Sequence, residues 1–232
     1  MVGLVLVSHS DRLVEGLRDL VAQMEPEVPF ALAGGTDDGE LGTSLELVMA
    51  AIDDADSGDG AVILYDLGSA EMTAESALEF LDYDQRERVL VVDAPLVEGA
   101  IAAASTAGGG ANLGQVAAAA ARVCGPAEPA EEEDTAELGQ SVELELTNVG
   151  GLHARPAGQI SRAVRGLDAQ VRVERADTGE DANAASTLSL VALGAGAGTT
   201  IIVRAGGPDG QQALARVREL IADRFDEPAA EL

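Results

Sequence analysis

The sequence predicts two domains of different fold class, a doubly wound α/β domain with a parallel sheet and an α+β open-faced sandwich. Two observations lead to this prediction. In the first half, nearly all-apolar segments alternate with helix-like segments, which is typical of parallel strands buried on both faces. In the second half, strand-like segments alternate apolar with charged or polar residues, which indicates a sheet with one covered face.

Four apolar segments form the predicted sheet of the first domain: VGLVLV (2–7), VPFALA (28–33), GAVILYD (60–66) and RVLVVD (88–93). Apolar residues recur at helical spacing between them, and helices are expected there, among them 69–81 and 96–106. Strands that are joined through helices cross over with one hand, so the sheet is expected to be parallel and doubly wound.

The second domain is predicted to have strands at 141–147, 169–175 and 199–205 and a turn at 176–181. Helices fit residues 154–166, 186–193 and 209–223. The expected order is strand, helix, two strands, helix, strand and helix, with one sheet face left open.

An acidic segment with two prolines, GPAEPAEEEDTAELG (125–139), separates the halves and indicates a flexible linker. We therefore expect domains at 1–125 and 141–226, a linker at 126–140 and a tail at 227–232. Residues 1–125 hold 22 acids and 5 arginines, a net charge of −17, whereas residues 141–232 hold 13 acids and 9 arginines, a net charge of −4.

The chain of 232 residues carries a formal charge of −27, and all 14 basic residues are arginine. This charge repels nucleic acid, so no nucleic-acid partner is expected. The missing lysine fits a GC-rich or a salt-adapted source, and the sequence does not separate the two. No apolar run is long enough for a bilayer and no signal peptide is evident, which predicts a cytoplasmic protein without a membrane partner. The single cysteine, Cys124, excludes an internal disulfide and is expected in the core at a helix end.

One of the two histidines, His9, follows the first predicted strand, and Ser10 or Asp11 is placed to cap the next helix. Ligands of open α/β sheets bind beyond the carboxyl ends of the strands, and helix N-termini favour phosphate. The third strand would deliver Asp66 and Ser69 to the same rim. A carboxylate there can hold one imidazole nitrogen protonated and leave the other as a nucleophile. The alternative is a capping histidine with a structural role.

The other histidine, His153, also follows a strand and opens a helix, within NVGGLHARPAGQI (148–160). Pro156 fits the first helical turn, and Gly150 and Gly151 permit a tight backbone approach. The guanidinium of Arg155 can reach oxyanions held at the imidazole. These residues together predict a phosphate-accepting site. A zinc site and a serine-type triad are not expected, because the chain offers too few ligands and no nucleophile elbow.

The motif GLHARPA (151–157) identifies the second domain as similar to HPr, the histidine-containing phosphocarrier of the bacterial phosphotransferase system, over residues 141 to about 224. The segment 183–199 also resembles the regulatory-serine helix of HPr, which makes Ser186 a candidate regulatory site. The lysine that usually precedes this serine is Ala185 here, which favours a helix-capping role for Ser186 instead.

Residues 1 to about 125 resemble a mannose-type enzyme IIA domain. The segments LVLVSHSDRLVEGL, AGGTDDGELGTS, DLGSAEMTAESALE and APLVEGA are most similar to the family of phosphoryl-donor subunits of phosphotransferase-dependent dihydroxyacetone kinase. Sugar-transporting members usually carry a Gly-Gly-Ser/Thr-Pro element after the aspartate, and this chain has residues 68–71, GSAE, instead.

The resemblance implies a relay from phosphoenolpyruvate and enzyme I to Nδ1 of His153, beside Arg155, and then to Nε2 of His9, which Asp66 would orient. The final acceptor would be ADP on the nucleotide-binding kinase subunit. The ATP formed there would phosphorylate dihydroxyacetone on the dihydroxyacetone-binding subunit. We expect phosphate contacts from Ser8, Ser10, Ser69 and Ala154. No cofactor or metal is expected on this chain, only phosphohistidine intermediates, with Mg on the partner subunits. The family also implies a homodimer through the first domain.

Two other functions remain open at this point: a sugar-permease IIA protein with a fused HPr domain, and a regulatory binding module that carries phosphate as a signal. The sequence also leaves open whether His153 serves His9 of the same chain or of a dimer partner, and whether a separate HPr competes. A linker of about 15 residues has a root-mean-square span of roughly 20–25 Å, which gives the two domains a local concentration near the millimolar range. Opposite charge between the arginines near His153 and the acidic first domain would steer this encounter.

Overall fold

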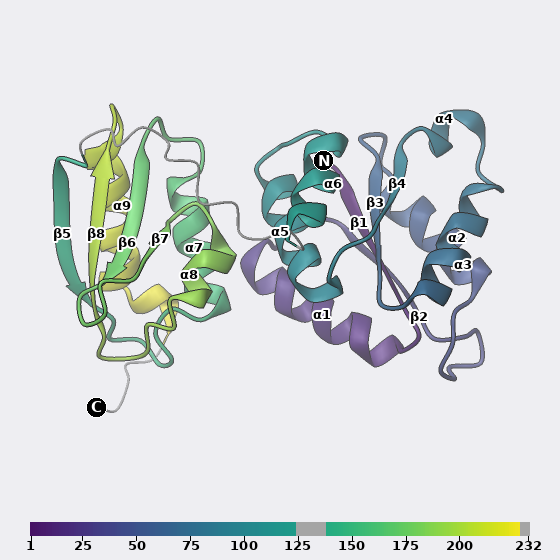
Figure 1. Ribbon diagram of the computed structural model, residues 1–232, viewed down its shortest axis with the longest axis horizontal. Helices are drawn as coiled ribbons and strands as arrows, with labels where there is room; N and C mark the ends of the chain where they lie inside the picture. The colour runs from purple at the N-terminus through teal and green to yellow at the C-terminus, as the bar shows by residue number, and fades with distance from the viewer. Residues whose placement is uncertain (124–137, 228–232) are drawn as a thin grey trace. The chain divides into compact units, whose positions relative to one another are not determined.

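The computed structural model describes residues 1–123 and 138–227, and contacts divide the chain into two compact units, Met1–Glu128 and Pro129–Leu232 (Figure 1). The expectation for Cys124 lies outside the described residues, as does most of the predicted linker. Gln140, which we placed in the linker, is the first residue of a strand of the second unit.

The first unit is an α/β unit with a parallel sheet, as predicted. Its strands are β1 (Gly3–Ser8), β2 (Phe30–Gly34), β3 (Ala61–Tyr65) and β4 (Val89–Val92), in the order β2-β1-β3-β4. Its helices are α1 (Asp11–Met24), α2 (Leu45–Ala55), α3 (Gly68–Leu78), α4 (Tyr83–Arg86), α5 (Leu96–Gly108) and α6 (Leu113–Arg122). We did not predict α4 and α6, although Asn112 and Gln115 form a capping box at the start of α6.

Helices cover both faces of this sheet. The apolar side chains of α2 and α3 pack on one face in a single core cluster with residues of all four strands, while α1, α5 and α6 lie on the other face. The prediction of strands buried on both faces holds for β1 and β3, and it is wrong for β2 and β4. The reason is that β2 and β4 form the edges of the sheet, where the helices leave some residues partly or fully exposed.

The strand order places a topological switch point between β1 and β3. The connection from β1 leads to β2 on one side, and the connection from β3 leads to β4 on the other. The two helices that follow these strands, α1 and α3, therefore diverge from a common rim beyond Ser8 and Tyr65. Open α/β sheets bind their ligands at such a point.

The second unit is an α+β sandwich, and its elements follow the predicted order. The antiparallel sheet has the order β5-β8-β6-β7, formed by β5 (Gln140–Glu145), β6 (Gln170–Arg175), β7 (Asp181–Asn183) and β8 (Thr200–Gly206). The helices are α7 (Ala154–Val164), α8 (Thr187–Ala192) and α9 (Gly210–Ala222), and a 3-10 turn, η1 (Arg224–Asp226), follows α9.

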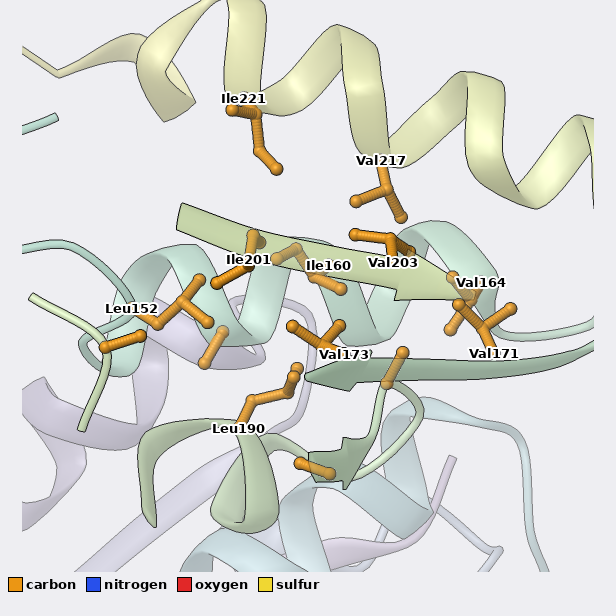
Figure 2. Packing of buried hydrophobic residues seen from close by; sticks show 14 of the residues in the cluster. Leu152, Ile160, Val164, Val171, Val173, Leu190, Ile201, Val203, Val217 and Ile221 are labelled. Atoms are coloured by element: carbon orange, nitrogen blue, oxygen red, sulfur yellow. The ribbon is translucent and has the colours of Figure 1, made fainter. Parts of the chain in front are cut away.

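One apolar core joins these helices to one face of the sheet (Figure 2). Side chains of α7 and α9, among them Ile160 and Val217, point toward Val203 and Val173 on the central strands. The opposite face carries charged pairs such as Arg204 with Glu174, as the alternating pattern predicts. In the part of the chain that is described, no helix combines the length and apolar character needed to cross a bilayer.

Candidate functional site

The side chains of His9 and Asp66 meet at the switch point of the first unit. His9 follows β1, Asp66 follows β3, and His9 Nδ1 lies 2.9 Å from Asp66 Oδ1. The carboxylate also accepts hydrogen bonds from the backbone amides of His9 (2.9 Å) and Leu67 (2.8 Å) and from the hydroxyl of Ser8 (2.8 Å). These bonds fix the carboxylate against the imidazole ring.

This network decides which nitrogen of His9 is available for chemistry. Burial of the Asp66 carboxyl opposes ionisation, but the hydrogen bonds from His9 and Ser8 outweigh it and lower the pKa of Asp66. The carboxylate is therefore ionised at neutral pH and can only accept, so Nδ1 of the neutral imidazole carries the proton. This tautomer leaves the lone pair on Nε2, which is then the nitrogen that can act as a nucleophile.

The Nε2 atom of His9 faces the start of α3. Ser69 Oγ lies 2.8 Å from Nε2, and Ser69 is the second residue of that helix. Helix N-termini present unpaired amides and the positive end of the helix dipole, which stabilise an anion. A phosphoryl group on Nε2 would therefore lie at the N-terminus of α3.

Ser8 and Ser10, for which we predicted phosphate contacts, lie at the end of β1 and just before α1 and have different surroundings. Ser8 is buried, and its hydroxyl donates to Asp66 while it accepts from the backbone amide of Ser10 at 3.0 Å. Ser10 occupies the N-cap position of α1 without a side-chain cap bond. The hydroxyl of Ser8 therefore positions Asp66. The phosphate contacts predicted for Ser8, Ser10 and Ser69 stay predictions.

His153 is the N-cap residue of α7, as predicted, and two glycines shape the loop before it. Gly150 and Gly151 have positive φ angles of 87° and 67°. A Cβ atom on Gly151 would lie 2.2 Å from the carbonyl oxygen of Ala195, so this approach requires glycine. The close contact lets the Leu152 amide donate to the same carbonyl at 2.8 Å, which fixes the loop that carries His153.

A carboxylate that the sequence analysis assigned to the tail contacts His153. The two carboxylate oxygens of Glu227 lie 3.0 and 3.2 Å from Nε2 of His153. The side-chain amide of Asn148 donates to Glu227 Oε2 and to the carbonyl of Gly151, both at 2.9 Å. Sequence reasoning missed Glu227 because 74 residues separate it from His153. The first unit offers the one signal that could have raised the question, because there a carboxylate, Asp66, faces the histidine.

The remaining predicted site residues lie around α7 and α8. Ala154 begins α7, and Arg155 is exposed, with no polar partner among the described side chains. Arg155 is therefore available to an anion near His153. Ser186 caps α8 by accepting a hydrogen bond from the Ser189 amide at 3.2 Å, which agrees with the capping role that we favoured. No cluster of three or more candidate metal ligands occurs among residues 1–123 and 138–227.

Two family models match the chain, one for each unit. Residues 3–117 match the PTS system fructose IIA component, and residues 140–223 match the PTS HPr component phosphorylation site. The folds, the two histidines and these matches define a phosphotransferase-system protein in which an enzyme IIA unit is fused to an HPr unit. Similar proteins of known name identify the family within this class.

The chain belongs to the DhaM family, the phosphoryl donor subunits of PEP-dependent dihydroxyacetone kinase. The DhaM of Klebsiella michiganensis is 36% identical over 98% of this chain and 52% of its own length. A DhaM of Listeria innocua is 42% identical over 45% of this chain and 84% of its own length. The phosphocarrier protein NPr of Escherichia coli is 42% identical over 36% of this chain and 92% of its own length. The chain spans about half the length of the first relatives that it matches.

Proposed function

We propose that this chain relays a phosphoryl group from His153 to His9 and then to ADP on the nucleotide-binding subunit of a dihydroxyacetone kinase. The observation that carries the proposal is the His9–Asp66 pair, which leaves Nε2 as a nucleophile at the N-terminus of α3. A second histidine at a helix N-terminus within the same chain supplies a matching donor. The DhaM relatives are named as phosphoryl donor subunits, which agrees with this direction of transfer.

Each transfer in this relay exchanges one P–N bond for another bond to phosphorus. The lone pair of His9 Nε2 attacks the phosphorus on His153 while the Nδ1–P bond breaks and returns its electron pair to Nδ1. The proton on His9 stays on Nδ1, hydrogen-bonded to the Asp66 carboxylate, so no proton has to move. Such steps depend on positioning and on charge neutralisation, which α3, Ser69 and Arg155 can supply.

The upstream donor in this proposal is phosphorylated enzyme I, which uses phosphoenolpyruvate, and the ATP formed downstream phosphorylates dihydroxyacetone on the third subunit. The chain itself binds no cofactor, and Mg acts only on the partner subunits. We place these reactions in the cytoplasm and propose that the first unit forms a homodimer. The net charge of −27 suits protein partners rather than nucleic acid, and the His9 side chain is partly accessible to them.

A sugar-permease function is the main alternative, since mannose-type IIA units also serve transporters. The two functions differ in the final acceptor of the phosphoryl group. Purified nucleotide-binding kinase subunit and ADP should remove the phosphoryl group from the phosphorylated chain and form ATP. If the chain keeps its phosphoryl group under these conditions, while a sugar-permease subunit accepts it, the kinase proposal is wrong.

The contact of Ser69 with His9 predicts a moderate effect of a single substitution. In Ser69→Ala, transfer to His9 should slow by roughly two- to tenfold, because the hydroxyl that lies 2.8 Å from Nε2 can no longer donate a hydrogen bond, worth about 0.5–1.5 kcal/mol, to the phosphoryl oxygens during transfer. Rapid-quench measurement of the label on His9 checks this. Ser76→Ala is the matched control, since the Ser76 hydroxyl lies on the same helix and donates to the Met72 carbonyl. Equal rates of transfer to His9 in Ser69→Ala and Ser76→Ala would show that Ser69 has no role in the transfer.

The charge difference between the units predicts a salt dependence of the transfer between them. The first domain carries −17 and the exposed Arg155 lies beside His153, so added salt should screen their attraction and slow transfer several-fold. Single-turnover transfer at low and high KCl measures the effect, and a rate independent of salt would contradict steering.

A further inference from the structure

The carboxylate of Glu227 is held at His153 by a buried partner. The Glu227 side chain is only 11% exposed, and the Asn148 residue that donates to it is 1% exposed. The side-chain amide of Asn148 also donates a hydrogen bond to the carbonyl of Gly151, in the loop that leads to His153. The carboxylate, the amide and the histidine loop therefore form one connected unit, and Glu227 does not lie at His153 by a chance surface contact.

The backbone before Glu227 adopts a conformation that side-chain-bearing residues seldom take. Arg224, Phe225 and Asp226 have φ angles of 53°, 54° and 58°, in the left-handed region that L residues avoid. The side chain of Phe225 is 1% exposed within the core of the second unit, and its carbonyl faces the Gln159 side chain. Strained backbone persists only where its surroundings fix it, and Phe225 supplies that anchor. The turn then directs Glu227 back to the start of α7.

From this geometry we infer that Glu227 is a positioning residue for phosphoryl transfer at His153, a role that rests on the proposed relay. An ionised carboxylate only accepts hydrogen bonds, so its contact with Nε2 places the ring proton on Nε2 and leaves the lone pair on Nδ1. Asp66 does the reverse at His9, where its contact with Nδ1 leaves Nε2 free. The two carboxylates thus select opposite nitrogens in the donor and the acceptor.

The same contact acts during the transfer itself. The lone pair of Nδ1 attacks the phosphorus of the incoming donor, the Nδ1–P bond forms, and the donor's bond to phosphorus breaks with its electron pair returning to the donor. Positive charge then develops on the imidazole of His153, whose Nε2 proton stays hydrogen-bonded to Glu227. A carboxylate paired to a histidine in this way orients the ring and stabilises the imidazolium.

The experiment compares the full-length wild type with Glu227→Ala and Glu227→Gln, and Glu219→Ala serves as a control that removes an exposed acid from α9. NMR of the His153 ring nitrogens in the unphosphorylated chain reports the tautomer, and labelling by enzyme I and phosphoenolpyruvate reports the rate. We expect one tautomer, with the proton on Nε2, in the wild type and the control, and a mixture in Glu227→Ala. Its labelling rate should fall about tenfold to a hundredfold.

The variant Glu227→Gln distinguishes a positioning role of Glu227 from a role in folding alone. Its amide oxygen can still accept from Nε2, so the tautomer should be retained while the labelling rate falls by less than in Glu227→Ala. A single tautomer and an unchanged labelling rate in Glu227→Ala would overturn the inference. Failure of the relay has a different signature, because then the wild type itself takes no label on His153 whereas the tautomer still depends on Glu227.

Discussion

Asp66→Asn is expected to slow phosphoryl transfer from His153 to His9 by about a hundredfold to ten-thousandfold. Asparagine cannot accept all the hydrogen bonds that the Asp66 carboxylate accepts from the His9 ring, two backbone amides and Ser8. An asparagine amide directed at the ring would favour the tautomer with its proton on Nε2, which removes the nucleophile. In a serine protease triad the equivalent change lowers turnover by about ten-thousandfold, through the wrong tautomer. Single-turnover labelling of His9 measures the loss.

The label on His153 provides an internal check for this variant. His153 should be phosphorylated by enzyme I as fast as in the wild type, because Asp66 belongs to the other unit. Asp38→Asn, at an exposed position of the same unit, should leave both labels unchanged. A normal rate of transfer to His9 in Asp66→Asn would show that Asp66 has only a structural role.

Gly151→Ala is expected to have the largest effect on stability, because two penalties add at one position. A Cβ atom there would lie 2.2 Å from the Ala195 carbonyl oxygen, and the φ angle of 67° is unfavourable for alanine. Left-handed strain and overpacking together predict a loss of about 2–5 kcal/mol in the free energy of unfolding of the second unit. Urea unfolding followed by circular dichroism measures it.

A second glycine isolates the contribution of the contact. Gly179 has a similar φ angle of 74°, but a Cβ atom on it would meet no atom within 4 Å. Gly179→Ala should therefore lose only about 1–2 kcal/mol, from backbone strain alone. Equal losses in the two variants would mean that the close approach of Gly151 to Ala195 has no role. Because the Gly151 carbonyl accepts from the His153 amide at 3.0 Å, the unstable variant should also take up label slowly.

The two fold classes could be predicted because hydrophobic periodicity differs so clearly between the halves. The continuous apolar runs of β1 and β3 identify the first sheet, and the alternating patterns of β5 and β6 identify the second. Periodicity did not indicate α6, whose central run of alanines has no polar face to mark a period. It also does not distinguish edge strands from central ones, which is why the exposure of β2 and β4 differed from the prediction.

The sites were predicted in part, and the reason again lies in sequence distance. His9, Asp66 and Ser69 could be brought together on paper, because the carboxyl ends of parallel strands share one rim. The hydrogen bond from buried Ser8 to Asp66 could not be predicted. A serine at the end of a strand can bind a ligand as readily as it can donate to a neighbouring carboxylate. Glu227 reaches His153 through a left-handed turn that contains no glycine. Arg224, Phe225 and Asp226 give no sequence signal for positive φ angles, so the turn could not be predicted.

The relay between the two histidines is tested most directly by labelling three proteins with enzyme I and radiolabelled phosphoenolpyruvate: the wild type, His9→Ala and His153→Ala. Peptide mapping then locates the label. The account predicts label on both histidines of the wild type, label only on His153 in His9→Ala, and little or none in His153→Ala unless free HPr is added. Label on His9 of His153→Ala at the wild-type rate, with no HPr present, would contradict it.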